Sequence, residues 1–346
     1  MRSALLLILG FIYAACLDAQ PSLTGPVEAY TFDAPTRSLR AVFGFPGAAS
    51  FSLALRDGLE FASVAPRQNY SIGFQRGRCL LISGLGSSAL STRALAGVEA
   101  QPEGIAWSGN GSLAILYSLT GNWLQTISGL PSAPAVGTRV DGSALGGGLG
   151  GVLASVAADA QGKQIAAGVT RDAGAVYQSS DGETFTSLKA VTKPIALAFS
   201  SDASTLYVLD GSVPQVVAIN VSSHGYQSIP LAGLANPVAI QAVENSQNSQ
   251  QLYIAANGAA ANGAAASVIR VLDVQSQQIV TDVPLSFQAT SLDQFGSNSF
   301  VVAARAQSVN PLWLFSSTPQ PAAYFVPAIQ LLHPDHRRAE VLGGAR

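Results

Sequence analysis

The feature that most constrains the fold of this chain is an apolar unit that returns roughly every 42 to 51 residues from about Leu59 to Ala328. Each copy opens with an apolar segment that ends in a polar turn, as in Ile195–Ala203, and two further apolar runs follow, as in Leu206–Leu209 and Val216–Ile219. One such unit cannot bury its apolar faces without neighbours, so a period of this length indicates a propeller or a solenoid. We therefore predict an all-β fold, a β-propeller of four-stranded blades.

The positions of the strands follow from short apolar runs that Gly, Asn, Asp, Ser and Pro separate. We expect inner strands to begin near Leu59, Glu103, Val152, Pro194, Pro237 and Phe287. Second strands are expected at Tyr70–Phe74, Leu113–Tyr117, Gln164–Val169, Leu206–Leu209, Gln251–Ala255 and Phe300–Ala304. The alanine-rich stretch Ala255–Ala266 interrupts the sixth unit and is predicted to be a surface loop.

The number of blades is open between six and seven, and we favour seven. Six inner pairs of strands are matched by seven outer pairs, because Val27–Phe32 and Ser38–Phe45 form an additional outer pair at the N-terminal end. A ring of blades must close against its first blade. We expect strands from both termini to share one blade, since this closes the ring and leaves no exposed sheet edge.

The N-terminal segment has the pattern of an export signal. Arg2 precedes an apolar stretch, Ala4–Cys16, which is too short to span a bilayer of about 30 Å, and Ala19 ends a small-residue cleavage site. The alternative is lipid attachment at Cys16, which Tyr13 disfavours because Leu is usual three residues before a lipidated cysteine. We expect a signal peptide over residues 1–19, one propeller domain over 20–328, a disordered tail over 329–346, and a periplasmic or extracellular location.

Composition excludes some partners. A net charge of −2 with 11% charged residues and no cluster of Lys and Arg argues against nucleic-acid binding. No segment after the signal is apolar for long enough to cross a membrane, and we expect a monomer. Removal of residues 1–19 leaves one cysteine, Cys79, in the strand pattern Arg78–Ile82, where a buried and inert thiol is expected.

Units five and six resemble the YVTN-type propeller repeat, a relative of the WD-repeat and lactonase-like propellers. The residues that carry the resemblance are Ala198–Asp202, Leu206–Asp210, Val217–Asn220, Leu252–Asn257 and Val268–Asp273. Units three, four and seven match more loosely. The resemblance implies a propeller fold, and its members range in function from enzymes to scaffolds, so it indicates the architecture and not the activity.

The segment Ser179–Phe185 resembles the Asp-box of sialidase-type propellers, with one residue of the spacing missing and Phe185 in place of Trp. In that motif the Asp and Ser side chains accept backbone N–H groups in a hairpin turn. We therefore predict a structural turn here. The chain has only three histidines, which argues against a Ser-His-Asp hydrolase.

Polar residues in the loops between second and third strands are the candidate ligand-binding residues, since these loops surround one mouth of the central channel. They are Arg76, Arg171, Asp172, Asp210, Asn257 and Arg305. Such a ring suits an anionic or sugar-like ligand, and Asp172, Asp210 and Asn257 together would suit calcium. The alternative is that these loops are polar because water reaches them.

The most economical function is an exported, non-enzymatic binding or interaction module for a protein or glycan partner. No nucleophile–base pair and no metal triad can be assembled from the motif spacing, so no catalytic residue is assigned, and no cofactor is expected apart from the calcium considered above. The alternative is a lactonase-like propeller hydrolase with a divalent metal at the central channel. A quinone-dependent dehydrogenase is disfavoured, because Trp107, Trp123 and Trp313 occupy unequal positions in their units.

Overall fold

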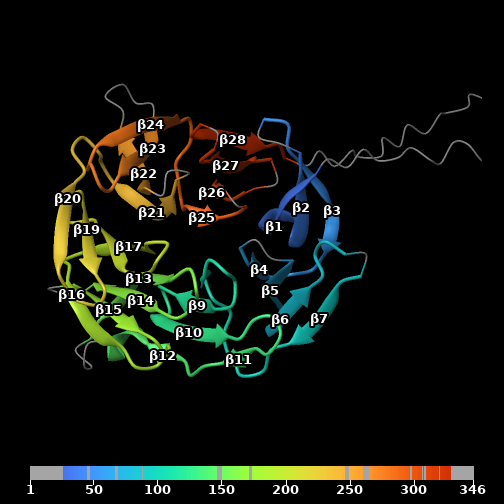
Figure 1. Ribbon diagram of the computed structural model, residues 1–346. Helices are drawn as coiled ribbons and strands as arrows, with labels where there is room; N and C mark the ends of the chain where they lie inside the picture. Colours follow the sequence, from blue (N-terminus) through green and yellow to red (C-terminus); the bar gives the residue numbers. More distant parts are fainter. Residues whose placement is uncertain are drawn as a thin grey trace, which may run out of the picture.

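The fold is a ring of seven antiparallel sheets around a central axis (Figure 1). The computed structural model describes residues 26–328 except 45–46, 67–68, 88, 146–149, 171–173, 246–248, 260–264, 297, 306, 308 and 319. Within these residues the only helical segments are two short 3₁₀ turns, η1 (Ala34–Thr36) and η2 (Gly142–Ala144). None of them forms a helix long and apolar enough to cross a bilayer. The predicted all-β propeller is confirmed, and the number of blades is seven.

Blades 2 to 7 each begin with the strand nearest the axis and proceed outward. Blade 2 contains β4 (Phe61–Val64), β5 (Tyr70–Gln75), β6 (Arg78–Ser83) and β7 (Ser91–Ala94). Blade 3 contains β8 (Gly104–Trp107), β9 (Ala114–Ser118), β10 (Trp123–Ser128) and, both paired with β10, β11 (Ala135–Val136) and β12 (Val140–Asp141). Blade 4 contains β13 (Val152–Ala158), β14 (Ile165–Thr170), β15 (Ala175–Ser179) and β16 (Thr186–Ala190).

The remaining blades complete the ring. Blade 5 contains β17 (Pro194–Phe199), β18 (Thr205–Asp210), β19 (Gln215–Asn220) and β20 (Tyr226–Pro230). Blade 6 contains β21 (Pro237–Glu244), β22 (Gln250–Ala259), β23 (Ala265–Asp273) and β24 (Ile279–Leu285). Blade 7 contains β25 (Asp293–Gln294), β26 (Ser299–Ala303), β27 (Leu312–Ser316) and β28 (Ala322–Val326). Blade 1 has three strands, β1 (Val27–Asp33), β2 (Ser38–Phe43) and β3 (Ser50–Arg56).

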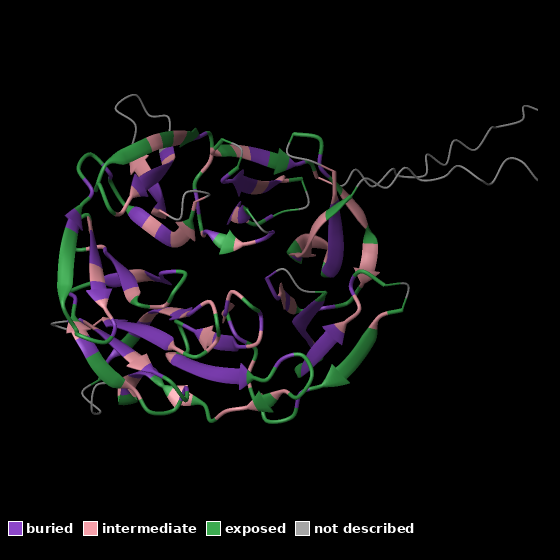
Figure 2. Ribbon diagram, viewed as in Figure 1, coloured by how far each residue is buried: buried purple, intermediate pink, exposed green. Residues whose placement is uncertain are grey.

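The core lies between neighbouring blades, which explains the apolar runs in the sequence. The two middle strands of a blade are covered on both faces, whereas outer strands such as β7 expose their side chains (Figure 2). Between blades 2 and 3, for example, Tyr70, Ile72 and Phe74 of β5 pack with Ala114 and Leu116 of β9. Each fully buried aliphatic or aromatic side chain contributes about 1.5–3 kcal/mol relative to exposure. A strand buried on both faces carries no alternating polar residue, so it appears as a continuous apolar run.

Two turn motifs found in the sequence fold as expected. In the segment that resembles an Asp-box, Ser179 Oγ donates to Asp181 Oδ1 at 2.8 Å, and Asp181 Oδ1 accepts the backbone N–H groups of Glu183 and Thr184. These hydrogen bonds hold the pKa of Asp181 well below its usual range. The turn after β17 contains the same Ser-to-Asp hydrogen bond, since Ser200 Oγ donates to Asp202 Oδ1 at 2.6 Å. The predicted structural role of the first turn is confirmed.

Two expectations from the sequence are wrong, and one strand was not anticipated. The stretch Ala255–Ala266 is not simply a loop, because Ala255 to Ala259 continue β22 and pair with β23 down to Ala265. The innermost strand of blade 7 begins at Asp293 and not near Phe287, whose ring stacks on Trp313 at a centroid distance of 4.1 Å. Strand β3 was not expected, since its half-exposed pattern gives no apolar run.

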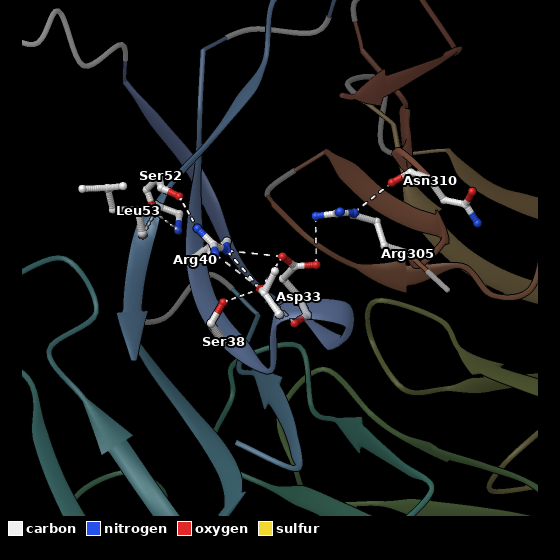
Figure 3. A network of polar contacts seen from close by, with 9 residues as sticks. Asp33, Ser38, Arg40, Ser52, Leu53, Arg305 and Asn310 are labelled. Atoms are coloured by element: carbon white, nitrogen blue, oxygen red, sulfur yellow. Dashed lines mark hydrogen bonds and ion pairs between the residues drawn. The ribbon is translucent and has the colours of Figure 1, made fainter. Parts of the chain in front are cut away.

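The seam between the last and first blades is closed by side chains in the described part of the chain. Val42 and Ala49 of blade 1 pack with Leu312, Leu314 and Val326 of blade 7. Asp33 at the end of β1 also forms an ion pair with Arg305 of blade 7 (Figure 3). Among the described residues, no sheet combines strands from both ends of the chain. Residues 1–25 and 329–346 are not described. The predicted signal peptide, Cys16 and the C-terminal tail lie there too.

Candidate functional site

Of the described residues predicted to line the channel mouth, Arg76 and Arg305 lie in loops, Asp210 ends β18 and Asn257 lies within β22. Their polar atoms are bonded mainly within the protein. Arg76 is exposed in the turn between β5 and β6, where its backbone N–H donates to Glu60 Oε1 at 3.1 Å. Asp210 is only 4% exposed. Its Oδ1 accepts the backbone N–H of Ser212 at 2.9 Å and the hydroxyl of Ser212 at 2.6 Å, and its Oδ2 accepts Gln215 Nε2 at 3.4 Å. Asp210 therefore caps its own turn.

Asn257 and Arg305 connect neighbouring blades. Asn257 Nδ2 donates to the carbonyl of Ala289 at 2.8 Å, and Asn257 Oδ1 accepts the N–H of Ala289 at 2.9 Å, which ties blade 6 to the segment that leads into blade 7. Arg305 is 5% exposed, and its Nη1 lies 2.9 Å from Asp33 Oδ1. Its Nε donates to the carbonyl of Asn310 at 2.8 Å.

Of the three predicted calcium ligands, the structure describes Asp210 of blade 5 and Asn257 of blade 6. Arg171 and Asp172 lie outside the described residues. Among the described residues no group of three His, Cys, Asp or Glu side chains is placed to hold a metal ion. The side-chain oxygens of Asp210 and Asn257 already accept hydrogen bonds from their own loops and from Ala289.

Two glutamates at the starts of inner strands also serve the turns. Glu60 accepts the backbone N–H groups of Arg76 and Gly77, and Glu103 accepts Ser118 Oγ at 2.9 Å and the N–H of Leu119 at 3.0 Å. Hydrogen bonds from Thr120 and Ser118 lower the pKa of Glu103. In blades 2 and 3, the carboxylate that precedes the innermost strand therefore stabilises the turn between the second and third strands of its blade.

A pair of titratable side chains beside the axis was not anticipated from the sequence. Asp293 lies on β25, the strand of blade 7 nearest the axis, and its side chain is exposed. Tyr117 on β9 has its pKa raised to about 12 by burial and by the charges of Asp293 and Glu103. Gly104 leaves room for this ring, since a Cβ there would collide with the Tyr117 hydroxyl. The wrong position expected for the inner strand of blade 7 concealed Asp293.

A groove on the outer side of blades 2 and 3 has a volume of about 770 Å³. It exists because the outer strand of blade 3 is split into β11 and β12, with Gly137–Arg139 between them. Buried Gln125 spans the two blades there, donating from Nε2 to the carbonyls of Gly97 and Gly137 at 2.9 Å each. The lining residues are Arg93, Ala94, Leu95, Ala96, Gly97, Glu99, Gln125, Ala133, Pro134, Val136, Gly137, Thr138 and Arg139.

The charges of this groove come from both blades. Arg93 on β7 is exposed and donates from Nη2 to the carbonyl of Pro131 at 3.4 Å. Arg139 is exposed, and its guanidinium lies 4.6 Å from the centre of the Trp123 ring. Glu99 is the one carboxylate among the lining residues, so the lining carries an excess of positive charge. Two arginines at one groove provide planar donors suited to carboxylates.

Comparison with known proteins supports the fold. No family model matches the chain, and no curated protein sequence matches it significantly. Two solved structures are similar. A functionally unknown protein from Desulfotomaculum acetoxidans DSM 771 is 10% identical over 87% of this chain and 99% of that chain, with a TM-score of 0.54. The dihydro-heme d1 dehydrogenase NirN in complex with DHE is 14% identical over 91% of this chain and 67% of that chain, with a TM-score of 0.52. A chain of the nidogen/laminin complex is 15% identical over 73% of this chain and 91% of that chain, with a lower TM-score of 0.46. At such identities the likeness concerns the fold alone.

Proposed function

We propose that this protein is an exported, non-enzymatic binding module that holds an acidic segment of a partner protein in the groove between blades 2 and 3. The observation that carries the proposal is the placement of Arg93 and Arg139, one from each blade, at a groove whose volume suits a short peptide. Ala94, Pro134 and Val136 supply apolar contacts beside these charges. The lining residues include no aromatic side chain on which a sugar ring would stack, which favours a peptide over a glycan.

Direct binding measurements test this function. The probe is a fluorescein-labelled pentapeptide of glutamate, with a pentapeptide of lysine as the negative control. We expect saturable binding of the acidic peptide that weakens as salt rises, because carboxylate–arginine pairs at a surface are screened. Arg93→Glu and Arg139→Glu should each weaken binding at least about tenfold, since each replaces an attraction by a repulsion.

The matched control is Arg78→Glu, which makes the same charge change at an exposed position on β6 outside the groove. Arg78→Glu should leave the affinity within about twofold of the unchanged protein. Equal losses in all three variants would mean non-specific attraction to net charge, and no loss in the groove variants would refute the assigned site.

The proposal includes two further points. The chain is related to the YVTN-type and lactonase-like propellers, and it is exported. The Ser200–Asp202 turn, with its 2.6 Å hydrogen bond, supports the relation. Cell fractionation and mass spectrometry of the mature N-terminus test the export. We expect Gln20 as the first residue, whereas a lipidated Cys16 would favour the anchored alternative.

The second candidate is the lactonase-like hydrolase with a divalent metal. The position of Asp293 on β25, the strand of blade 7 nearest the axis, favours it. Calcium and magnesium titrations by calorimetry test it. Stoichiometric binding that Asp293→Asn or Asp210→Ala abolishes would support the hydrolase, and absence of heat would leave the binding module as the better account.

A further inference from the structure

The floor of the groove between blades 2 and 3 contains a glutamine amide that is held in one orientation. Gln125 is only 4% exposed. Its Nε2 donates to the carbonyl of Gly97 at the entry to blade 3 and to the carbonyl of Gly137 in the outer part of blade 3, at 2.9 Å each. These two bonds use both N–H donors of the amide. Because rotation of the amide would break them, the position of Oε1 is fixed.

Oε1 of Gln125 is an acceptor at the surface of the groove. In the described part of the chain, both side-chain hydrogen bonds of Gln125 come from Nε2, and none goes to Oε1. Oε1 is not one of the fully enclosed polar atoms without a partner in that part of the chain, so it reaches the groove that Gln125 lines. A fixed acceptor beside a cavity suits an N–H donor of a bound molecule, because the hydrogen bond then forms at little cost in ordering.

The two arginines of the groove lie near opposite ends of β10, and Gln125 lies between those ends. The guanidinium of Arg139 lies 4.6 Å from the centre of the ring of Trp123, the first residue of β10. At the other end, Arg93 Nη2 donates to the carbonyl of Pro131 in the turn that follows β10. Each guanidinium has five N–H donors, so these contacts leave donors for a carboxylate.

This placement sets the spacing between the acidic side chains of a bound segment. Strand β10 has 6 residues, so its ends are about 16 Å apart at about 3.3 Å per residue. In an extended chain, residues i and i+4 are separated by about 13 Å, and their side chains lean outward over the remaining distance. Adjacent residues lie about 3.8 Å apart, which is too close for one carboxylate to reach each arginine.

We propose that the groove takes an extended peptide with acidic residues at i and i+4, one carboxylate on Arg139 and the other on Arg93, and a main-chain N–H between them on Gln125 Oε1. This pose deepens the proposed function and rests on it. In an extended chain the N–H groups of successive residues point to opposite sides, so only alternate amides face the floor. The ligand class is thus an extended acidic peptide, and a dicarboxylate without amides is not equivalent to it.

Two peptides of the same composition test the spacing. Fluorescein-labelled Glu-Gly-Gly-Gly-Glu should bind at least about threefold more tightly than labelled Gly-Gly-Glu-Glu-Gly, because it alone reaches both arginines. Arg93→Glu should remove this preference, whereas the control Arg78→Glu should keep it. Equal affinity of the two peptides for the unchanged protein would refute the spacing.

Ester replacements in the first peptide test the hydrogen bond to Gln125. Each internal amide is replaced in turn by an ester, which removes its N–H and leaves the chain length and the charge unchanged. Replacement at one amide should weaken binding at least about fivefold, since Oε1 would lose its donor, and the neighbouring amides should tolerate it within about twofold. Equal effects at every amide, or no effect at any, would contradict the proposed hydrogen bond.

The variant Gln125→Met identifies the acceptor. Methionine keeps the length of the side chain and removes the acceptor, so the amide and ester forms at the sensitive position should bind this variant within about twofold of each other. The matched control, Gln227→Met, makes the same change at an exposed position on β20 and should keep the difference between the two forms. The peptide comparisons use the unchanged protein, so they decide the matter even if Gln125→Met fails to fold.

The outcomes separate this pose from the proposed function. If pentaglutamate binds through Arg93 and Arg139 but neither the spacing nor the ester position matters, the extended pose is wrong and the proposed function stands. If pentaglutamate does not bind through these arginines, both are wrong.

Discussion

Removal of the Asp33 carboxylate should destabilise the ring more than removal of any surface charge. Asp33 is 1% exposed and lies between two arginines of different blades, with Arg305 Nη1 at 2.9 Å and Arg40 Nε at 3.3 Å (Figure 3). It also accepts the Thr36 hydroxyl at 2.5 Å. Asp33→Ala would leave two guanidinium groups buried without their counter-charge.

The expected magnitude follows from this burial. The side chains of Arg40 and Arg305 are 9% and 3% exposed, so water cannot replace the lost carboxylate. Breaking a buried ion pair by removing one partner costs about 3–5 kcal/mol. A domain has only about 5–15 kcal/mol of net stability, so this loss would be a large fraction of the total. Arg305→Ala should cost less, because Asp33 keeps its pair with Arg40.

Equilibrium urea unfolding measures these differences. The control is Arg37→Ala, which removes an exposed pair with Glu60 at 3.9 Å and a hydrogen bond from Nε to the Leu59 carbonyl at 3.1 Å, and should cost about 2 kcal/mol or less. The double variant Asp33→Ala/Arg305→Ala should be less destabilised than the sum of the two single variants, since the residues are in contact. An Asp33→Ala loss no larger than that of Arg37→Ala would refute the reasoning.

Three further predictions concern other parts of the ring. Cys79 is 2% exposed and burial raises its pKa to about 12, so the native protein at pH 8 should not react with a disulfide reagent while the urea-unfolded protein reacts fully. Gly104→Ala should cost about 1–3 kcal/mol in urea unfolding because its Cβ collides with the hydroxyl and Cζ of Tyr117, and adding Tyr117→Leu, which removes both atoms, should recover part of that loss. Hydrogen bonds lower the pKa values of Asp202 and Glu103, so these carboxylates stabilise the fold above their unfolded pKa values, about 4. Stability should therefore be constant from pH 7 to about pH 5 and fall as the pH drops through the lower, folded pKa values, and a rise in stability on acidification would contradict this.

The propeller could be predicted from the sequence because its middle strands are local apolar runs. Tyr70–Gln75 and Thr205–Asp210 are buried on both faces, so each carries an uninterrupted signal that its own residues supply. The turn at Ser179–Asp181 is also local, since its hydrogen bonds join residues within three positions of one another. Strand β3 was missed because its apolar residues, Phe51, Leu53 and Leu55, alternate with polar or small ones and form no continuous apolar run.

The candidate sites could not be predicted in the same way. Asp210, Asn257 and Arg305 have the polar character expected of a channel mouth, but whether such a group faces a ligand or its own backbone depends on the loop geometry. Arg93 and Arg139 are unremarkable in the sequence. They line one groove because two blades lie side by side and the outer strand of blade 3 is interrupted.

The sequence by itself determined the periodic all-β architecture, the order of most strands and the turn chemistry, because these depend on residues close together in the chain. The tertiary structure alone decided the number of blades, the three-stranded first blade and the seam. Asp33 and Arg305 are 272 positions apart, and no local pattern in the chain relates them. Their pairing exists because the ring brings the last blade against the first, where two buried charges require each other.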